Sequence, residues 1–270
     1  MNNDVTIITA FLDIGRDSWE GYKRNVDQYL KAFSVYLKYD YKMIIYIDDR
    51  YYKDVFDMVD FSEHKNNKIV IPINEQWMEK NIWSWTRLGK EFQIMNSDSY
   101  KSLVADRIRL NYPENTNPKY TILTHSKIDF VNHAIESNFL DSKYFAWSDF
   151  GYFHDKTSFE FLPNSTLDVN KFDLDRVNLC LINPIDDNDK DEIWTLKNAP
   201  EKIGAYFFFG TKEKLDIFQN LCHRFLIEYQ ERGIADDEQG LWLKCYFHDP
   251  DLFKLHVFGS WHRALKAFSL

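Results

Sequence analysis

The stretch of sequence that decides the fold is VTIITAFL, at residues 5–12, a short apolar run rich in β-branched side chains. Such a run is typical of a strand buried on both faces, and it leads into a polar segment at residues 13–16. Two similar runs follow, KMIIYI at residues 42–47 and IVIPI at residues 69–73, with helical patterns between them. Strands that alternate with helices predict an α/β fold with a mostly parallel sheet flanked by helices.

The remaining elements follow from hydrophobic periodicity and from turn-forming residues. Residues 22–37 and 121–140 carry apolar side chains at helical spacing, and the second of these helices is expected to begin near His125 or Ser126. Residues 76–112 are expected to be mostly helical, whereas PENTNP at residues 113–118 is dense in helix breakers and is expected to be a loop. Further strands are predicted at residues 144–147, 177–182, 205–209 and 255–258, and helices at residues 212–232 and from residue 236 onward.

Composition and charge exclude several classes of protein. The chain has 270 residues, of which 44% are hydrophobic and 28% charged, as in a globular protein, and its net charge of −9 argues against nucleic-acid binding. A negative charge still permits phosphate binding through a metal ion, because the metal needs carboxylates rather than lysines. The three cysteines form no CxxC pair, and no basic leader or run of about 20 apolar residues is present, so we expect a cytoplasmic protein.

The segment YFAWSDFGY, at residues 144–152, places a carboxylate at the end of a buried strand. Asp149 would then face the crevice where parallel sheets bind their ligands. Mg²⁺ and Mn²⁺ prefer oxygen ligands and can bridge such a carboxylate to a diphosphate, which stabilises the departing nucleotide. The alternative for Asp149 is a turn or a helix cap.

The segment ADDEQG, at residues 235–240, opens a predicted helix with three carboxylates. One interpretation is that Asp236 caps the helix, because acidic side chains there accept hydrogen bonds from free N–H groups. The other is that Asp237 or Glu238 points into an acceptor pocket, where it binds a sugar hydroxyl or acts as a general base.

Basic side chains supply further candidates for ligand binding. Lys127 lies near a predicted helix N-terminus and is either a phosphate contact or an exposed lysine, and Arg107 and Arg109 are similar candidates. His256, on an apolar strand, is either a structural histidine or a metal ligand. The nearby His262 is either a phosphate contact or part of a solvated tail. No GxxxxGK[ST], GxGxxG, HExxH or GxSxG motif occurs, which counts against P-loop enzymes, standard dinucleotide oxidoreductases, zincins and α/β-hydrolases.

Taken in order, TAFLDIGR at residues 9–16, AWSDFGY at residues 146–152 and DDEQG at residues 236–240 resemble the HtrL/YibB family. The resemblance spans nearly the whole chain. Members of that family sit among bacterial lipopolysaccharide, capsule and other surface-glycan genes, and they are regarded as glycosyltransferase-like proteins of the GT-A fold. The resemblance therefore implies one GT-A-like domain over residues 1–270, with a nucleotide-sugar-binding half at residues 1–152 and an acceptor-side half at residues 153–270.

The resemblance also implies roles for particular residues. Asp149 stands at the second acid of a DxD motif whose first position is Trp147, and His256 begins an HxxG similar to that of glycogenin-like transferases; these two residues would hold Mn²⁺ or Mg²⁺. The acceptor-side catalytic residues would be Asp237, Glu238 and Gln239. The nucleotide-sugar-binding residues would be Thr9, Ala10, Phe11, Asp13, Arg16, Lys127, Trp147 and Gly151.

The predicted function is metal-assisted transfer of a sugar from a nucleotide-sugar donor, with UDP-sugars favoured, to a surface-glycan acceptor. The missing first acid of DxD favours one alternative, a non-catalytic glycan- or nucleotide-binding protein on a degenerate scaffold. A hydrolase or phosphatase that uses the clustered carboxylates is the other. Besides donor and acceptor, the tail at residues 261–270 offers apolar and basic side chains for contact with a membrane surface, although packing on the domain is the alternative. The donor sugar, the stereochemistry and the oligomeric state stay open.

Overall fold

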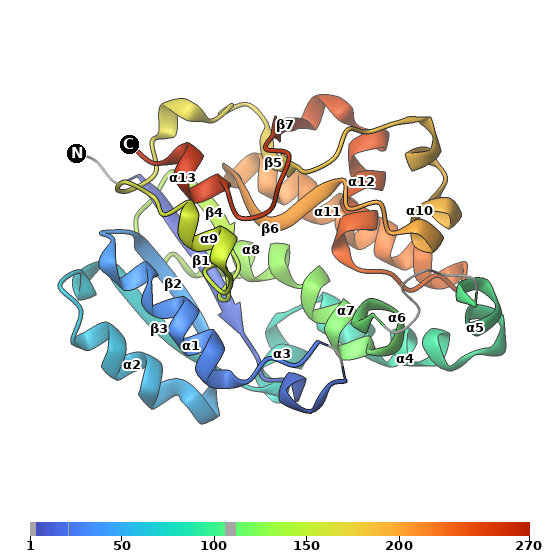
Figure 1. Ribbon diagram of the computed structural model, residues 1–270, viewed down its shortest axis with the longest axis horizontal. Helices are drawn as coiled ribbons and strands as arrows, with labels where there is room; N and C mark the ends of the chain where they lie inside the picture. Colours follow the sequence, from blue (N-terminus) through green and yellow to red (C-terminus); the bar gives the residue numbers. More distant parts are fainter. Residues whose placement is uncertain (1–3, 21, 106–111) are drawn as a thin grey trace.

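A computed structural model describes residues 4–20, 22–105 and 112–270 of the chain. At its centre lies a seven-stranded sheet in the order β3-β2-β1-β4-β6-β5-β7, with helices on both faces (Figure 1). The strands are β1 (Val5–Phe11), β2 (Lys42–Asp48), β3 (Lys68–Ile73), β4 (Tyr144–Ser148), β5 (Val177–Leu181), β6 (Ile203–Thr211) and β7 (Phe253–Val257).

The sheet is parallel in part. β1 pairs in parallel with both β2 and β4, β2 with β3, and β5 with β7, whereas β6 runs antiparallel to β4 and to β5. Four of the six pairings are parallel, so the prediction of a mostly parallel sheet is confirmed in part, with β6 as the antiparallel exception. Eight of the nine residues of β6 are buried, so its sequence reads as the same continuous apolar run as a parallel strand and does not encode its direction.

The strand order places a topological switch point between β1 and β4. From β1 the chain first adds β2 and β3 on one side, and then returns to add β4 on the other side. Loops that leave the ends of β1 and β4 therefore diverge, and ligands of open α/β sheets bind in the crevice that forms there.

Two layers of helices cover the sheet, as the alternation of side chains along the strands requires. In β1, Ile7 faces one layer and Ile8 the other, and both are fully buried. One layer consists of α1 (Val26–Ser34), α2 (Tyr52–Asp60) and α13 (Ala264–Phe268). The other consists of α3 (Glu75–Asn81), α4 (Leu88–Asn96), α5 (Asp98–Val104), α7 (Pro118–His125), α8 (Lys127–Ser137), α10 (Glu192–Asn198), α11 (Lys212–Glu231) and α12 (Glu238–His248).

Shorter elements complete the fold. The helices α6 (Pro113–Thr116) and α9 (Lys156–Glu160) have one turn or little more. The 3-10 turns are Arg16–Ser18, Tyr36–Lys38, Asp49–Tyr51, Lys65–Asn67, Ser84–Arg87, Val169–Lys171, Asp187–Lys190 and Pro250–Leu252.

The segment at residues 113–118, predicted as a loop, instead begins two helices. Pro113 and Pro118 occupy the first position of α6 and of α7, where a missing N–H costs nothing. Asn117 caps α7 by accepting a hydrogen bond from the backbone N–H of Tyr120 at 3.1 Å. The single helix predicted over residues 121–140 is likewise two helices, α7 and α8, which meet at Ser126.

The C-terminal tail packs on the sheet. Leu265 and Phe268, two of the apolar side chains that a membrane contact would use, are buried. Within the described residues, no helix combines the length and the apolar character needed to cross a bilayer.

A buried carboxyl group in the helical layer generates a prediction about stability. Glu91 of α4 is fully buried and accepts a hydrogen bond from Gln230 Nε2 of α11 at 2.7 Å. Burial raises the pKa of Glu91 to about 7. The folded state therefore keeps a proton that the unfolded chain loses near its ordinary pKa, so stability falls as pH rises from about 4.5 to about 7 and stays reduced above that.

We expect Glu91→Gln, which mimics the neutral carboxyl group, to remove this pH-dependent loss. The free energy of unfolding of the variant minus that of wild type should be higher at pH 8 than at pH 5, by about 2 kcal/mol. Urea unfolding of both proteins at the two pH values measures the difference. Parallel pH profiles would show that Glu91 titrates normally in the folded protein.

Candidate functional site

A cleft opens at the carboxyl ends of β1 and β4, at the switch point of the sheet. It encloses about 1130 Å³, including its open mouth. Its walls come from the loop after β1, from α1, α7, α8 and the start of α12, and from the segment after β7. Most of the sequence-predicted site residues line it: Ala10, Phe11, Asp13, Arg16, Lys127, Trp147, Asp149, Gly151, Glu238 and Gln239.

The floor of the cleft is organised by the buried side chain of Lys127. Its Nζ lies 2.9 Å from Asp149 Oδ1 and 2.8 Å from Glu238 Oε1, and it donates a hydrogen bond to the carbonyl oxygen of Ala205 at 2.9 Å. Burial acts to lower the pKa of Lys127, but the two carboxylates outweigh it, so the pKa lies above its ordinary value. Lys127 is therefore neither an exposed lysine nor a free phosphate ligand, but the counter-ion of two acids.

Asp149 is fixed through its backbone and through one carboxylate oxygen. Its N–H donates to the carbonyl oxygen of Tyr206 at 3.0 Å, and its own carbonyl oxygen accepts from Tyr36 Oη at 2.9 Å. Trp147 Nε1 donates to Asp149 Oδ1 at 2.7 Å. The Asp149 side chain is nevertheless 36% exposed, so part of the carboxylate faces the cleft. The indole at the first DxD position thus positions the remaining acid.

The start of α12 carries the predicted acidic segment. Asp237, and not Asp236, is the N-cap residue, and its Oδ1 accepts from Gln239 N at 3.0 Å. Burial, together with the neighbouring acids Glu238 and Asp236, raises the pKa of Asp237 well above its ordinary value. Glu238 is 4% exposed, and its Oε2 has no hydrogen-bond partner. A buried carboxylate oxygen without a partner is costly, so this atom is a candidate for contact with a ligand.

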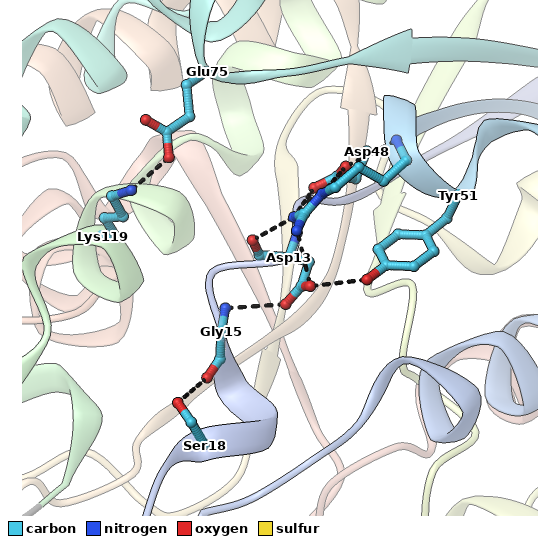
Figure 2. Close-up of polar contacts among 8 residues, drawn as sticks. Asp13, Gly15, Ser18, Asp48, Tyr51, Glu75 and Lys119 are labelled. Atoms are coloured by element: carbon cyan, nitrogen blue, oxygen red, sulfur yellow. Dashed lines mark hydrogen bonds and ion pairs between the residues drawn. The ribbon is translucent and has the colours of Figure 1, made fainter.

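The loop after β1 is held rigidly by a polar network (Figure 2). Asp13 accepts from Gly15 N at 3.0 Å through Oδ1 and from Tyr51 Oη at 3.0 Å through Oδ2. The backbone N–H of Asp13 donates to Asp48 at 3.1 Å, and Arg50 pairs with Asp48 at 2.6 Å. Burial acts to raise the pKa of Asp48, but its hydrogen bonds from Arg50 and Asp13 lower it overall. Asp13 therefore shapes the wall of the cleft with both of its carboxylate oxygens already occupied.

The same view shows two further contacts near this loop (Figure 2). Ser18 Oγ donates to the carbonyl oxygen of Gly15 at 2.7 Å, which closes the turn. Gly15 has φ 80°, a conformation that other residues adopt at a cost. An ion pair between Lys119 and Glu75 joins α7 to α3.

His256 does not lie at the cleft. It is on β7, separated from β4 by β6 and β5, and its Nε2 is 2.8 Å from Asn178 Oδ1. Burial lowers the pKa of His256 to about 4. The predicted pairing of His256 with Asp149 is therefore corrected, because the two residues face different surroundings three strands apart.

Two other histidines line the cleft, His154 and His262. Of these, His262 follows β7 in the chain. It is 8% exposed, its Nδ1 has no hydrogen-bond partner, and its backbone has φ 60°. The sequence predicts His262 only as a phosphate contact or part of a solvated tail, and its burial contradicts the second of these. β7 is parallel to β5 and hence to β1 and β4, so the loop after it reaches the same edge of the sheet. The sequence alone does not show the direction of β7, and so does not show which edge of the sheet this loop reaches.

Four other candidates lie away from the floor of the cleft or outside the described residues. Thr9 is fully buried within β1 and does not line the cleft. Asp237 lines a neighbouring cleft. Arg107 and Arg109 lie outside the described residues.

We expect Lys127→Met to destabilise the protein by about 3 kcal/mol or more, because it leaves two acids without their counter-ion. Adding Asp149→Asn and Glu238→Gln should recover much of this loss, since the acids are then neutral. Urea unfolding of the single and triple variants measures both effects. A loss below about 1 kcal/mol in the single variant would mean that the three groups are not coupled.

Comparison with known proteins finds three similarities. A solved structure of mouse xyloside xylosyltransferase 1, in its apo form, aligns with a TM-score of 0.43 and 10% identity over 94% of this chain and 85% of that one. Protein HtrL of Escherichia coli (strain K12) is 27% identical over 297 residues, which cover 99% of this chain and 93% of that protein. The model of the family described as "Bacterial protein of unknown function (HtrL_YibB)" matches residues 3–270, and the chain belongs to this family.

Proposed function

We propose that the protein transfers a sugar from a nucleotide-sugar donor to a glycan acceptor. The observation that carries the proposal is the meeting of Asp149, Lys127 and Glu238 at the floor of the switch-point cleft. Parallel sheets bind nucleotides at this place, and the floor offers both a partly exposed acid and a buried acid with one free oxygen.

The walls of the cleft support binding of a nucleotide. Phe11 packs against Tyr29 and Phe150, with ring centroids 4.7 and 5.3 Å apart, and all three line the cleft. Such rings suit a base or a ribose. The guanidinium groups of Arg16 and Arg24 line the same cleft and suit a diphosphate. A UDP-sugar remains our preferred donor on the strength of the family resemblance.

Mn²⁺ or Mg²⁺ fits this arrangement with two protein ligands. At the cleft, Asp149 offers a carboxylate and His262 offers Nδ1, which has no hydrogen-bond partner and lies 3.8 Å from Asp155 Oδ2. The described residues contain no group of three or more His, Cys, Asp or Glu that could hold a metal alone, so oxygens of the diphosphate would complete the coordination. Bound there, the metal would neutralise the charge of the departing nucleoside diphosphate.

Glu238 is our choice for the residue that receives the proton of the acceptor hydroxyl. Its Oε2 is free, while Lys127 holds Oε1 and so fixes the direction of the carboxylate. We also propose a cytoplasmic location, since Cys180, Cys222 and Cys245 are all free, as expected in a reducing compartment.

One observation favours a second candidate, a non-catalytic protein that binds a nucleotide or glycan. Trp147 stands where transferases of this type carry an acid, and its N–H holds Asp149. In that case the cleft would bind a nucleotide sugar but cleave none.

Calorimetric titration with a panel of nucleotides and nucleotide sugars, with and without Mn²⁺, tests the donor site. We expect one nucleoside diphosphate to bind, to bind about tenfold more tightly with Mn²⁺, and to lose that gain in Asp149→Asn. Asp54→Asn, on the exposed face of α2, is the matched control and should bind like wild type. No binding by any member of the panel would contradict the donor site.

Turnover separates the two candidate functions. We expect Glu238→Gln to lower transfer by about 100-fold or more and to leave nucleotide affinity nearly unchanged, because it removes the proton acceptor and keeps the shape. Glu79→Gln, at an exposed position of α3, controls for the loss of a charge. Nucleotide-sugar binding by wild type with no turnover in the presence of any acceptor would favour the non-catalytic protein.

A further inference from the structure

A short segment joins β7 to α13 and forms part of the wall of the switch-point cleft (Figure 1). We call this segment, residues 259–263, the strap. Before it, the backbone N–H of Phe258 donates to the carbonyl oxygen of Leu181 at 2.9 Å. After it, the backbone N–H of Leu265, a fully buried residue, donates to Tyr152 Oη at 3.1 Å. Both flanks of the strap are therefore held in place by hydrogen bonds.

The middle of the strap makes few hydrogen bonds. Ser260 Oγ, His262 Nδ1 and Arg263 Nε are buried without a hydrogen-bond partner, and they are three of the eleven such side-chain atoms among the described residues. In the same described part of the chain, the backbone N–H groups of Ser260, Trp261 and His262 donate no hydrogen bond. Buried polar groups are normally paired, so this concentration of unpaired groups in four residues needs an explanation.

Left-handed backbone occurs near both ends of the strap. Gly259 has φ 67° and His262 has φ 60°. Glycine adopts this conformation freely, whereas a residue with a side chain adopts it at a cost in free energy. Strain and unpaired polar groups both raise the free energy of this conformation of the strap, relative to one in which the groups find partners. Residues at the two ends of a segment whose backbone angles can change serve as hinges.

Side chains of the strap differ in their access to the cleft. Trp261 and His262 line the cleft, and the ring of Trp261 packs against Tyr206 with centroids 5.6 Å apart. Ser260 and Arg263, on either side of this pair, do not line it. The unpaired Oγ and Nε atoms of these two residues therefore reach a ligand in the cleft only if the strap moves.

Arg263 is a cation that is available to a ligand. Its guanidinium carbon lies 4.4 Å from the centroid of the Phe161 ring. Within the described residues, no ion pair joins Arg263 to a carboxylate. A guanidinium group that stacks on a ring keeps its N–H groups free for an anion.

The unpaired groups of the strap indicate the chemistry of the ligand. Backbone N–H groups and the Nε–H of arginine only donate hydrogen bonds, and a serine hydroxyl can donate as well. The guanidinium groups of Arg16 and Arg24 line the same cleft. A ligand that matches this set offers several acceptor oxygens and negative charge, which is the chemistry of a diphosphate.

We propose that the strap closes on the diphosphate of a bound nucleotide, so that Ser260 Oγ and Arg263 Nε donate hydrogen bonds to its oxygens. This rests on the proposed function, since it assumes that a nucleotide occupies the cleft. Gly259 and His262 absorb the change in backbone angles, while the flanks of the strap stay in place. Closure pairs the polar groups that are unpaired in the open protein, and it separates the diphosphate from water.

Hydrogen exchange measured by mass spectrometry tests the closure on the full-length protein. The probes are UDP, GDP, ADP and CDP, each with Mn²⁺, and the nucleoside that matches whichever of them binds. We expect exchange at residues 258–264 to slow by about fivefold or more when the nucleoside diphosphate binds, because unpaired N–H groups become hydrogen-bonded. The helix α2 is the internal control and should exchange at the same rate with and without the nucleotide.

Two variants test the contacts with the diphosphate. Ser260→Ala removes a hydroxyl that has no partner in the open protein, so the stability of the free protein should not fall. Its affinity for the nucleoside diphosphate should fall by about three- to tenfold. Arg263→Lys keeps the charge but loses Nε–H, and its affinity should fall by about tenfold. Ser137→Ala, at an exposed position of α8, is the matched control and should bind like wild type.

The outcomes separate failure of this inference from failure of the proposed function. Binding of a nucleoside diphosphate with unchanged exchange of the strap, or with wild-type affinity in both variants, overturns the inference alone. Equal protection of the strap by the matching nucleoside, which has no phosphate, also overturns it. Failure of every nucleotide to bind wild type overturns the proposed function and the inference together.

Discussion

The structure around the cleft depends on one buried cation. Lys127 bridges Asp149 of the segment after β4 and Glu238 of α12, and it also binds the carbonyl oxygen of Ala205 on β6. Its ammonium group thereby joins elements that lie about 110 residues apart in the sequence. A buried charge without partners would cost several kcal/mol, so the four groups are stable only together. The position of each acid relative to the other is set before any ligand arrives.

That constraint explains why the surroundings are rigid. Trp147 and the backbone of Tyr206 hold Asp149 in one orientation, and Asp237 caps the helix that presents Glu238. If the proposed transfer is right, a site that brings a donor and an acceptor together benefits from such preorganisation, because reorganisation at the moment of reaction is avoided. Part of the Asp149 carboxylate stays exposed at the cleft, and Glu238 keeps one buried oxygen without a hydrogen-bond partner, while Lys127 holds the other oxygen of each acid.

Sequence patterns predicted what depends on local chemistry. The buried runs of β1, β2 and β4 and the acid after β4 were found because continuous apolar runs and a terminal carboxylate are local signals. The direction of β6 was not found, because a strand buried on both faces reads alike in either direction. The prediction that His256 lies beside Asp149 failed for the same reason. His256 and His262 are six residues apart, and the strand pairing is needed to show which of them reaches the cleft. The pairing of Lys127 with two acids is a long-range contact that no local pattern encodes.

The charge balance at the floor relates Lys127 to the tryptophan at position 147, where a DxD motif would have its first acid. Two carboxylates and one ammonium leave one negative charge in excess, which repels a diphosphate, whereas Arg16 and Arg24 on the walls attract it. A divalent cation beside Asp149 would reverse the sign of the floor. Because Lys127 already neutralises one acid, this site needs less positive charge from a cation than a site with two unpaired acids would need. Trp147 fits that balance, since it offers Asp149 a neutral hydrogen-bond donor and adds no further negative charge.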